Sequence, residues 1–387
     1  MKALRICAGP VARASLAAHG LQPQHVATIP GAAGGPKGLI LGAMDRFLFG
    51  EWLPRSDQAV DLVGASIGAW RMATACLDNP VAAFERLEHD YIHQHYELVP
   101  GQKRVTADQV SETFGRSLQS FYGGRIPEVL NHPRYRLHIV TSRGRHVLHT
   151  EHGLRTPLGY LGAFLTNTVR RKAMGAWLER VVFSSTVADE GRAAALPFAT
   201  GDYRTRQVAL SEGNFNPALQ ASCSIPFVLR AIQDIPGAPK GAYWDGGITD
   251  YHLHLNYPGA GSMQGAINSG AARAHSTGAS GQIDAPRLVL YPHFQKSVVP
   301  GWLDKGLKWR HRSSPFLDTM VLLAPNPDWV KTLPNSKLPD RTDFTHYGND
   351  LDARVKAWTA ATRASQQMVD EFIAWLDKPD MNLVHPL

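Results

Sequence analysis

The sequence predicts an α/β fold with a mainly parallel central sheet, and two strand-turn-helix units carry that prediction. Apolar runs at Val26–Ile29 and Val60–Val63 are expected to be strands, and each leads through a glycine-rich turn into a helical stretch. Because that order is typical of crossover connections between parallel strands, both turns should lie at the carboxyl edge of one sheet, where ligands bind. The composition, 44% hydrophobic and 19% charged, is that of a globular chain with a large core.

The remaining elements follow from hydrophobic periodicity and from breaker residues. Further strands are expected at Leu137–Thr141, Val181–Ser185 and Leu288–Tyr291. Helices are expected over residues 10–20, about 39–52, a run ending near Leu77, 80–97, 158–180 and 352–376. Residues 259–282 are rich in Gly, Ala and Ser, and we expect a mobile loop there.

The chain is expected to form a single domain over residues 1–387. Within it we expect a motif-bearing core at about 25–255, a basic cap or insertion at about 101–200, and a C-terminal strand and helix within 285–387.

Positive charge is confined to one segment of the sequence. The chain carries 40 Lys and Arg against 33 Asp and Glu, a net charge of +7. Residues 101–200 hold 14 basic and 7 acidic residues, and the other residues together are neutral. A basic protein can meet nucleic acid, an anionic membrane or an acidic substrate. The neutral remainder argues against a surface coated with basic charge for nucleic acid.

Cysteine usage and hydropathy exclude several further classes. Cys7, Cys76 and Cys223 are far apart and odd in number, which predicts neither a disulfide framework nor a cysteine zinc site. The sequence has no run near the roughly 18 apolar residues of a transmembrane helix, and Arg13 and His19 interrupt any secretory signal. The expected location is therefore cytoplasmic. No acidic cluster indicates a calcium site, so we expect neither a metal nor a cofactor.

The sequence Gly64-Ala-Ser-Ile-Gly68 fits the G-x-S-x-G pattern of a nucleophilic serine. Such a serine lies on a sharp strand-to-helix turn, where small neighbours relieve crowding and the first N–H groups of the helix face developing negative charge. The predicted strand before Ser66 and the predicted helix after it favour this interpretation. An ordinary glycine-rich turn is the alternative.

Two other glycine-rich segments suit the same chemistry. Gly34-Gly35-Pro36-Lys37-Gly38 offers backbone N–H groups that can approach an oxyanion closely. It could also cradle a phosphate, although it fits neither the P-loop nor the dinucleotide pattern. Asp245-Gly246-Gly247 can either present a carboxylate to a serine hydroxyl or form a hairpin turn.

Taken in order, these segments resemble the patatin-like phospholipase family. That family combines a G-G-x-[R/K]-G oxyanion loop, a G-x-S-x-G nucleophile and a D-G-[G/A] aspartate, with an A-x-x-A-S-x-x-x-P segment shortly before the aspartate. Here Ser66 follows Gly38 by 28 residues, Asp245 follows Ser66 by 179, and Ala218–Pro226 matches the fourth segment. The resemblance covers about residues 25–255. The sequence departs from the family at Ala33, where many members carry a further Gly, and after Gly247, where the usual Asn and Pro are absent.

The resemblance implies a three-layer α/β/α fold with helical insertions, and a Ser–Asp dyad that hydrolyses carboxylic esters of lipids through an acyl-enzyme. Ser66 would be the nucleophile and Asp245 its base, with oxyanion N–H groups from Gly34 and Gly35 and a contribution from Ile67. Because a free carboxylate is a weak base, a desolvated Asp245 with a raised pKa would help. The other motif positions are Lys37, Gly38, Gly64, Gly68, Gly246 and Gly247.

Three alternatives stay open at the level of sequence. A Ser–Asp–His triad of an α/β-hydrolase is one, because four histidines follow Asp245: His252, His254, His293 and His346. Against it, the glycine loop ends in Lys-Gly and carries no preceding His. A non-catalytic lipid- or acyl-binding module is the second. A nucleic-acid or phosphate binder is the third, although no nucleic-acid motif is present.

The stretch Leu158–Arg180, inside the basic segment, combines apolar residues with Arg170, Arg171, Lys172 and Trp177. A helix of this kind can lie on an anionic lipid surface, or it can pack into the core with a solvated basic face. The expected partners are a lipid or acyl-ester substrate and, peripherally, an anionic membrane. The sequence indicates no nucleic acid as a partner and no particular oligomeric state.

Overall fold

The computed structural model describes residues 1–96, 101–102, 105–187, 191–258 and 287–387. Within them eleven strands form one sheet, in the order β11-β1-β10-β9-β2-β3-β4-β5-β6, and β8 joins along β4 with β7 beside it. The loop expected at residues 259–282 lies outside the described residues. The strands are β1 (Leu4–Ala8), β2 (Val26–Gly31), β3 (Val60–Ala65), β4 (Tyr135–Gly144), β5 (Leu178–Ser184), β6 (Thr205–Ala209), β7 (Ile232–Gln233), β8 (Ala242–Asp245), β9 (Leu288–Pro292), β10 (Met320–Pro325) and β11 (Val384–Pro386).

The centre of the sheet is parallel, as the sequence predicts. β9, β2, β3 and β4 run in the same direction, and β10 continues the parallel run beyond β9. Antiparallel pairs occur where β1 joins β10 and where β5 and β8 join β4. All five predicted strands fall within observed strands at their centres. The sequence does not predict the other six strands, β1, β6, β7, β8, β10 and β11, which are two to six residues long and show too little periodicity to be recognised.

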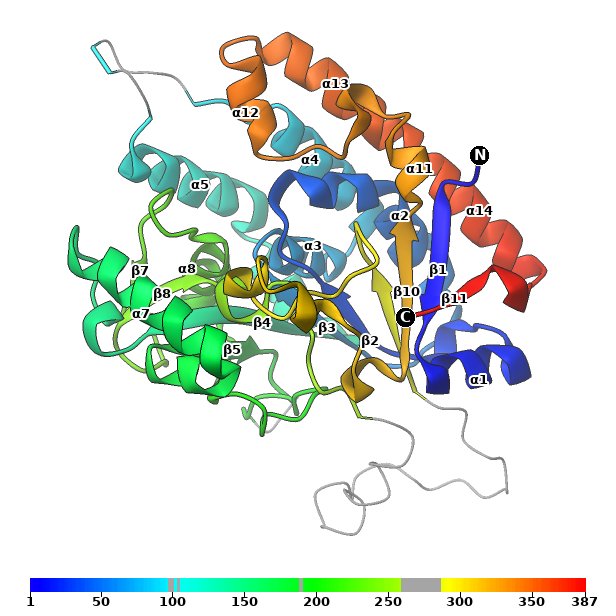
Figure 1. The fold of residues 1–387 in the computed structure, drawn as a ribbon, viewed down its shortest axis with the longest axis horizontal. Coiled ribbons are helices and arrows are strands. Elements are labelled where there is room, and N and C mark those ends of the chain that lie inside the picture. The colour runs from blue at the N-terminus through cyan, green and yellow to red at the C-terminus, as the bar shows by residue number, and fades with distance from the viewer. Residues whose placement is uncertain (97–100, 103–104, 188–190, 259–286) are drawn as a thin grey trace.

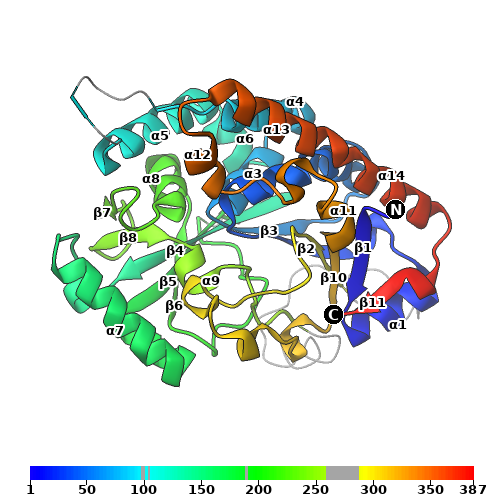
Figure 2. The same cartoon turned by 45° about the horizontal axis from the view of Figure 1, so that its top comes forward.

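Helices cover both faces of the sheet and complete a three-layer α/β/α arrangement (Figures 1 and 2). One hydrophobic core runs from Ala3 to Val384 and joins both ends of the chain to the central strands. One face carries α2 (Gly42–Phe47), α3 (Ile67–Ala75), α4 (Pro80–Ile92), α5 (Ala107–Tyr122), α8 (Glu212–Cys223), α13 (Leu351–Ala364) and α14 (Gln366–Asp377); the other carries α1 (Pro10–His19), α7 (Arg155–Val169) and α9 (Gly247–Asp250). Short helices α6 (Ile126–Leu130), α11 (Pro327–Val330) and α12 (Thr342–Tyr347) lie in connections.

The predicted helix over residues 158–180 is wrong in its second half. α7 ends at Val169, Arg170 takes an extended conformation, and a 3-10 turn over Arg171–Ala176 leads into β5. β5 pairs along its whole length with β4 and from residue 180 onward with β6, so tertiary pairing overrides the helical pattern. Arg180 is consequently a buried strand residue.

Two other helical predictions need smaller corrections. Residues 39–52 contain the end of a 3-10 turn, α2 and a π-helical turn rather than one α-helix. The run 352–376 is broken at Ser365, whose hydroxyl donates to the Thr362 carbonyl at 2.6 Å and competes with the helical pattern. α4 ends at Ile92, short of the predicted end at residue 97, which lies outside the described residues.

Residues 101–200 are not a cap inserted into the fold. They supply β4 and β5, which are interior strands of the sheet, together with α5, α6 and α7. Much of their positive charge is neutralised within the protein, since Arg136 pairs with Asp61 and Arg143 pairs with Glu179, each at 2.7 Å. The excess charge of this segment is therefore not a continuous basic surface.

Candidate active site

β3 and β8 lie end to end along one edge of β4. The last residue of β3, Ala65, pairs with Val140 in the parallel direction, and the last residue of β8, Asp245, pairs with Thr141 in the antiparallel direction. Since Val140 and Thr141 are consecutive, the carboxyl ends of two strands distant in sequence meet head to head. Ser66 follows β3 directly and is thereby brought to Asp245.

Ser66 occupies a strained turn between β3 and α3. Its φ of 56° and ψ of −132° are uncommon for a residue with a side chain, and α3 begins at the next residue, Ile67. The side chain is only 5% exposed. Its Oγ donates a hydrogen bond of 2.7 Å to Asp245 Oδ2. This is the geometry of a nucleophile elbow whose hydroxyl already faces a carboxylate.

Asp245 is buried and oriented from several sides. Its Oδ1 accepts the Gly247 N–H at 2.7 Å, which leaves Oδ2 for Ser66. Its backbone carbonyl accepts the Ser142 hydroxyl at 2.9 Å. Burial raises the pKa of the Asp245 carboxyl above its ordinary value, while the Ser66 hydrogen bond and the Arg341 charge oppose that rise. The carboxylate thus binds a proton more tightly than an exposed aspartate does, which is the direction that would help a Ser–Asp dyad.

Ser222 holds the two halves of the site together. It lies in the Ala218–Pro226 segment, and its Oγ accepts the Ser66 N–H at 3.0 Å and donates to the Val140 carbonyl at 2.7 Å. The Ser222 carbonyl accepts the Gly246 N–H at 3.1 Å. The A-x-x-A-S-x-x-x-P motif of this segment does not by itself indicate a role for the serine. The structure makes Ser222 a positioning residue for both Ser66 and the aspartate turn.

Position 68 requires glycine because the backbone of α3 contacts the backbone at the end of β2 there. A Cβ on Gly68 would overlap the carbonyl oxygen of Gly31, at the end of β2. The helix α3 therefore approaches β2 closely enough to present its first turn to the glycine loop. A Cβ on Gly64 would likewise overlap the backbone of Ala69. A Cβ on Gly246 would overlap the Val140 carbonyl, and a Cβ on Gly247 would overlap the Ala33 methyl.

The glycine loop lies beside the serine turn because β2 and β3 pair in parallel, with Gly31 opposite Gly64. Gly34 is covered by the Phe294 ring, and Gly35 has a φ of 58°, which favours glycine. Gly35 opens the 3-10 turn Gly35–Leu41 and Ile67 opens α3, so neither N–H has an acceptor within its own helix. These positions suit an oxyanion hole.

Lys37 and Gly38 have different surroundings. Gly38 packs against the Ile67 side chain, which ties the glycine loop to the serine turn. Lys37 places its Nζ 5.7 Å from the centre of the Phe294 ring.

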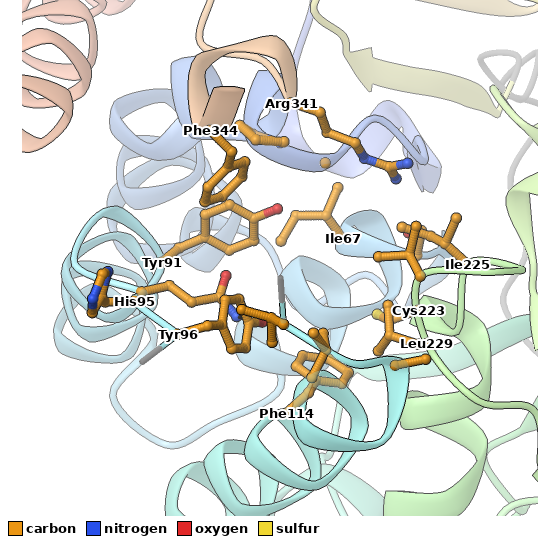
Figure 3. A pocket seen from close by; sticks show the side chains of 18 of the residues that line it. Ile67, Tyr91, His95, Tyr96, Phe114, Cys223, Ile225, Leu229, Arg341 and Phe344 are labelled. Carbon is orange, nitrogen blue, oxygen red and sulfur yellow. Dashed lines mark hydrogen bonds between the residues drawn. The ribbon is translucent and has the colours of Figure 1, made fainter. Parts of the chain in front are cut away.

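Two cavities meet at Ser66. The larger, about 610 Å³, is walled mainly by aromatic and aliphatic side chains (Figure 3). The smaller, about 210 Å³, contains Asp245 and several charged groups. Ser66, Ile225 and Arg341 line both. Walls of the larger cavity include Trp70, Tyr91, Tyr96, Phe114, Ile225 and Leu229. Apart from Ile225, which belongs to the Ala218–Pro226 segment, no sequence motif indicates them, since they come from α3, α4, the residues after α4, α5 and the loop after α8.

The four residues proposed for membrane contact do not form one surface. Arg171 is largely used inside the protein, where it donates to the Thr249 carbonyl at 2.5 Å and pairs with Asp250 and Asp304. Trp177 is half-buried against Gly162 of α7. Arg170 and Lys172 are exposed, although Lys172 also donates to the Gly201 carbonyl at 2.8 Å. The basic run is broken up because it lies in a turn rather than along a helix.

Arg171 belongs to a buried ion network beneath the aspartate turn. Arg180 binds Asp250 through two hydrogen bonds, of 2.6 and 2.7 Å, and both side chains are fully buried. Asp250 ends α9, the short helix that follows Asp245. Paired guanidinium groups lower the pKa of Asp250 despite its burial. The network thus fixes the helix that carries Gly247.

The histidines that could complete a triad lie elsewhere. In the described part of the chain, none of the four hydrogen-bonds Ser66 or Asp245. His252 contacts the backbone of Ser297 and Val299, and His254 bonds the Val298 carbonyl. His293 is bound to Gln295, and His346 contacts the Tyr347 ring. Burial lowers the pKa of His254 to about 4 and that of His293 to about 3. Among the described residues, the hydroxyl of Ser66 therefore faces the Asp245 carboxylate and no histidine joins the pair.

Comparison with known proteins returns no matching family model and no matching curated protein. Among the described residues, no helix combines the length and the apolar character needed to cross a membrane. Those residues also contain no group of three or more His, Cys, Asp or Glu side chains arranged to hold a metal ion.

Proposed function

We propose that this protein is a serine acyl hydrolase that cleaves carboxylic esters of lipid-like molecules, as the resemblance to patatin-like phospholipases implies. The observation that carries the proposal is the buried 2.7 Å hydrogen bond from Ser66 Oγ to Asp245 Oδ2 at the junction of the two cavities. A strained serine with its hydroxyl on a carboxylate of raised pKa suits nucleophilic catalysis.

In the first half of the proposed reaction, Ser66 Oγ attacks the ester carbonyl carbon while its proton moves to Asp245 Oδ2. The carbonyl oxygen becomes an oxyanion, which in this proposal accepts hydrogen bonds from the N–H groups of Gly34, Gly35 and Ile67. Collapse of this intermediate breaks the bond to the alkoxide, and Asp245 returns the proton to the leaving alcohol. The product is an acyl-Ser66 ester.

In the second half, a water molecule gives its proton to Asp245 and attacks the acyl carbon. The second tetrahedral intermediate expels Ser66 Oγ, which recovers the proton from Asp245. The carboxylic acid leaves and the dyad is restored, so no other co-reactant is needed. The apolar walls of the 610 Å³ cavity fit the acyl chain, because burial of each methylene contributes about 0.8 kcal/mol.

The test is to label the protein with a fluorophosphonate and to measure hydrolysis of a panel of short and long acyl esters and phospholipids. We expect labelling at Ser66 and turnover of at least one ester class. Ser66→Ala should lose both, while the exposed Ser117 supplies a matched control, Ser117→Ala. Failure of the wild type to react with the probe and with every ester would reject the proposal and favour a non-catalytic lipid-binding module.

We also propose that the enzyme meets an anionic bilayer through one face of α7. Leu154, Leu158, Leu161, Leu165 and Val169 follow helical spacing and are all more than half exposed. The helix contains no acidic residue, and the exposed Arg155 and Arg170 lie at its two ends. Tyr160 of α7 contacts the Phe227 ring, 6.0 Å between centres, and Phe227 lines the larger cavity. An apolar stripe with cationic ends suits an anionic lipid surface.

Vesicle flotation tests this contact. Wild type should bind vesicles of phosphatidylglycerol more strongly than those of phosphatidylcholine, and Leu161→Glu with Leu165→Glu should reduce the binding at least 10-fold. A Leu383→Glu variant, altering another exposed apolar residue, is the control. Equal binding by the α7 variant and the wild type would reject this role for α7.

A further inference from the structure

Three cationic side chains gather around the smaller cavity beside Ser66. Lys37 comes from the glycine loop, Lys305 from the turn after Trp302–Asp304, and Arg341 from the residue before α12. Within the described residues, none of these three side chains forms an ion pair or a hydrogen bond with another protein group. Their positive charge can therefore interact with a ligand that enters the cavity.

The position of Lys305 is set by aromatic contacts. Its Nζ lies 4.0 Å from the centre of the Tyr251 ring and 5.6 Å from that of Trp302. Partial burial, with repulsion from Arg341 and Lys37, lowers its pKa to about 8. All three cations line the same 210 Å³ cavity, so they lie close enough to repel one another. An arrangement that repels itself in the free protein is relieved when an anion binds.

The acidic groups of the cavity do not cancel this charge. Asp340 is paired with Lys337 at 2.7 Å, and the same carboxylate oxygen, Oδ1, accepts the Thr342 hydroxyl at 2.6 Å, so the charge of Asp340 is offset by a lysine outside the three. Asp245 is the carboxylate bonded to Ser66. Three cations therefore face the single carboxylate that the proposed chemistry employs, and the cavity keeps a positive excess.

The larger cavity has the opposite character. Its walls next to Ser66 are mainly apolar, and the two cavities meet at Ser66, Ile225 and Arg341. A substrate whose carbonyl carbon is at Ser66 Oγ can place its acyl chain in one cavity and its alcohol part in the other. The difference in polarity determines which part goes where, because an acyl chain gains nothing from the cationic cavity.

We propose that Lys37, Lys305 and Arg341 form an anion-binding subsite for the leaving-group side of the ester, so that the preferred substrates are acyl esters of an alcohol carrying a phosphate or carboxylate. This inference rests on the proposed hydrolase function. The anion is held and is not transformed: the bond that breaks is the acyl ester bond, and the protonated alcohol leaves with its anionic group intact.

The test compares two esters that differ only in that group, 1-octanoylglycerol and 1-octanoylglycerol 3-phosphate, below the concentrations at which they aggregate. The wild type should show a kcat/KM at least 10-fold higher for the phosphate. Lys305→Met and Arg341→Met should each lower the ratio of the two kcat/KM values about 10-fold, the effect typical of one hydrogen bond to a charged group. Lys308→Met, an exposed lysine three residues from Lys305 and outside both cavities, should keep the wild-type ratio.

The possible failures are distinguishable. Equal kcat/KM for the two esters in the wild type would overturn the subsite and leave the hydrolase proposal standing. A loss of the same size for both esters in Lys305→Met and Arg341→Met would also overturn it, because the cations would then act on Asp245 or the oxyanion. Competition by micromolar inorganic phosphate would identify the free anion as the ligand and overturn the assignment to the leaving group. Absence of both hydrolysis and Ser66 labelling would reject the function itself.

Discussion

Ser66 donates a 2.7 Å hydrogen bond to Asp245 although 179 residues separate them in the chain. The contact exists because the strands that end at these two residues share one edge of β4. Neither residue needs a mobile loop to reach the other, since both stand at the ends of buried strands. This arrangement leads to five predictions.

Asp245→Asn should abolish most of the activity while preserving the geometry. Asn can still accept the Gly247 N–H, but it cannot take the Ser66 proton. We expect kcat/KM to fall about 10²–10⁴-fold, the usual contribution of a general base, as measured with a soluble ester. Asp57→Asn, which changes an exposed aspartate away from both cavities, is the control. A variant as active as the wild type would exclude Asp245 as the base.

The same substitution should stabilise the protein in a pH-dependent way. Because the folded-state pKa of Asp245 is raised, the folded protein binds this proton more tightly than the unfolded chain does. The wild-type contribution to stability from this group therefore falls as pH rises from its ordinary pKa through the folded one. Asp245→Asn should have the larger free energy of unfolding above that window, and the difference should shrink as the pH is lowered through it. Urea denaturation at several pH values measures this, and a difference that grows toward acid would contradict the burial argument.

Gly68→Ala should destabilise the fold. The added methyl overlaps the Gly31 carbonyl oxygen, so α3 must move away from β2. We expect a loss of at least about 1–3 kcal/mol in the free energy of unfolding. Gly213→Ala is the matched control, since the new methyl on α8 meets nothing within 4 Å, and it should be neutral or slightly stabilising. Equal melting temperatures for the two variants would argue against the close approach.

Ser222→Ala should weaken both the fold and the catalytic turn. It leaves the Ser66 N–H and the Val140 carbonyl without their buried partner, at a cost of about 1–3 kcal/mol in unfolding free energy. Since Ser66 would lose its anchor, kcat should fall more than KM changes. Ser15→Ala offers the contrast, because the buried Ser15 hydroxyl has no partner within the described residues. Chemical denaturation together with steady-state kinetics separates the two effects.

Val110→Trp should shorten the range of acyl chains that the proposed hydrolase accepts. Val110 lies on α5 and lines the 610 Å³ cavity, and it takes no part in the hydrogen bond of the dyad, so a larger side chain reduces the volume open to an acyl chain. We expect the ratio of kcat/KM for a dodecanoyl ester to that for a butanoyl ester to fall about 10-fold, as the buried methylenes lose their contacts. An unchanged ratio would place the acyl chain elsewhere.

Local sequence patterns are sufficient to predict individual strands, turns and helices. β2 and β3 were predicted because each is a short apolar run that ends in a glycine-rich turn. Ser66 and Asp245 were proposed from motifs whose small residues relate to close contacts of the backbone, as at Gly68. The helix predicted over residues 158–180 is wrong in its second half because the apolar residues there suit either a helix or a strand. The pairing of β5 with β4 and β6 favours the strand.

The sequence by itself determined the strand-turn-helix units and indicated the chemistry proposed for two of the turns, since both depend on residues adjacent in the chain. Only the tertiary structure decided that Ser66 and Asp245 meet, that Ser222 holds both, and that Lys305 and Arg341 stand beside them. It also showed that Arg171 and Arg180 are used in a buried network beneath α9. The physical reason is that pairing along β4 and the burial of charge join residues far apart in sequence, and no local pattern records those distances.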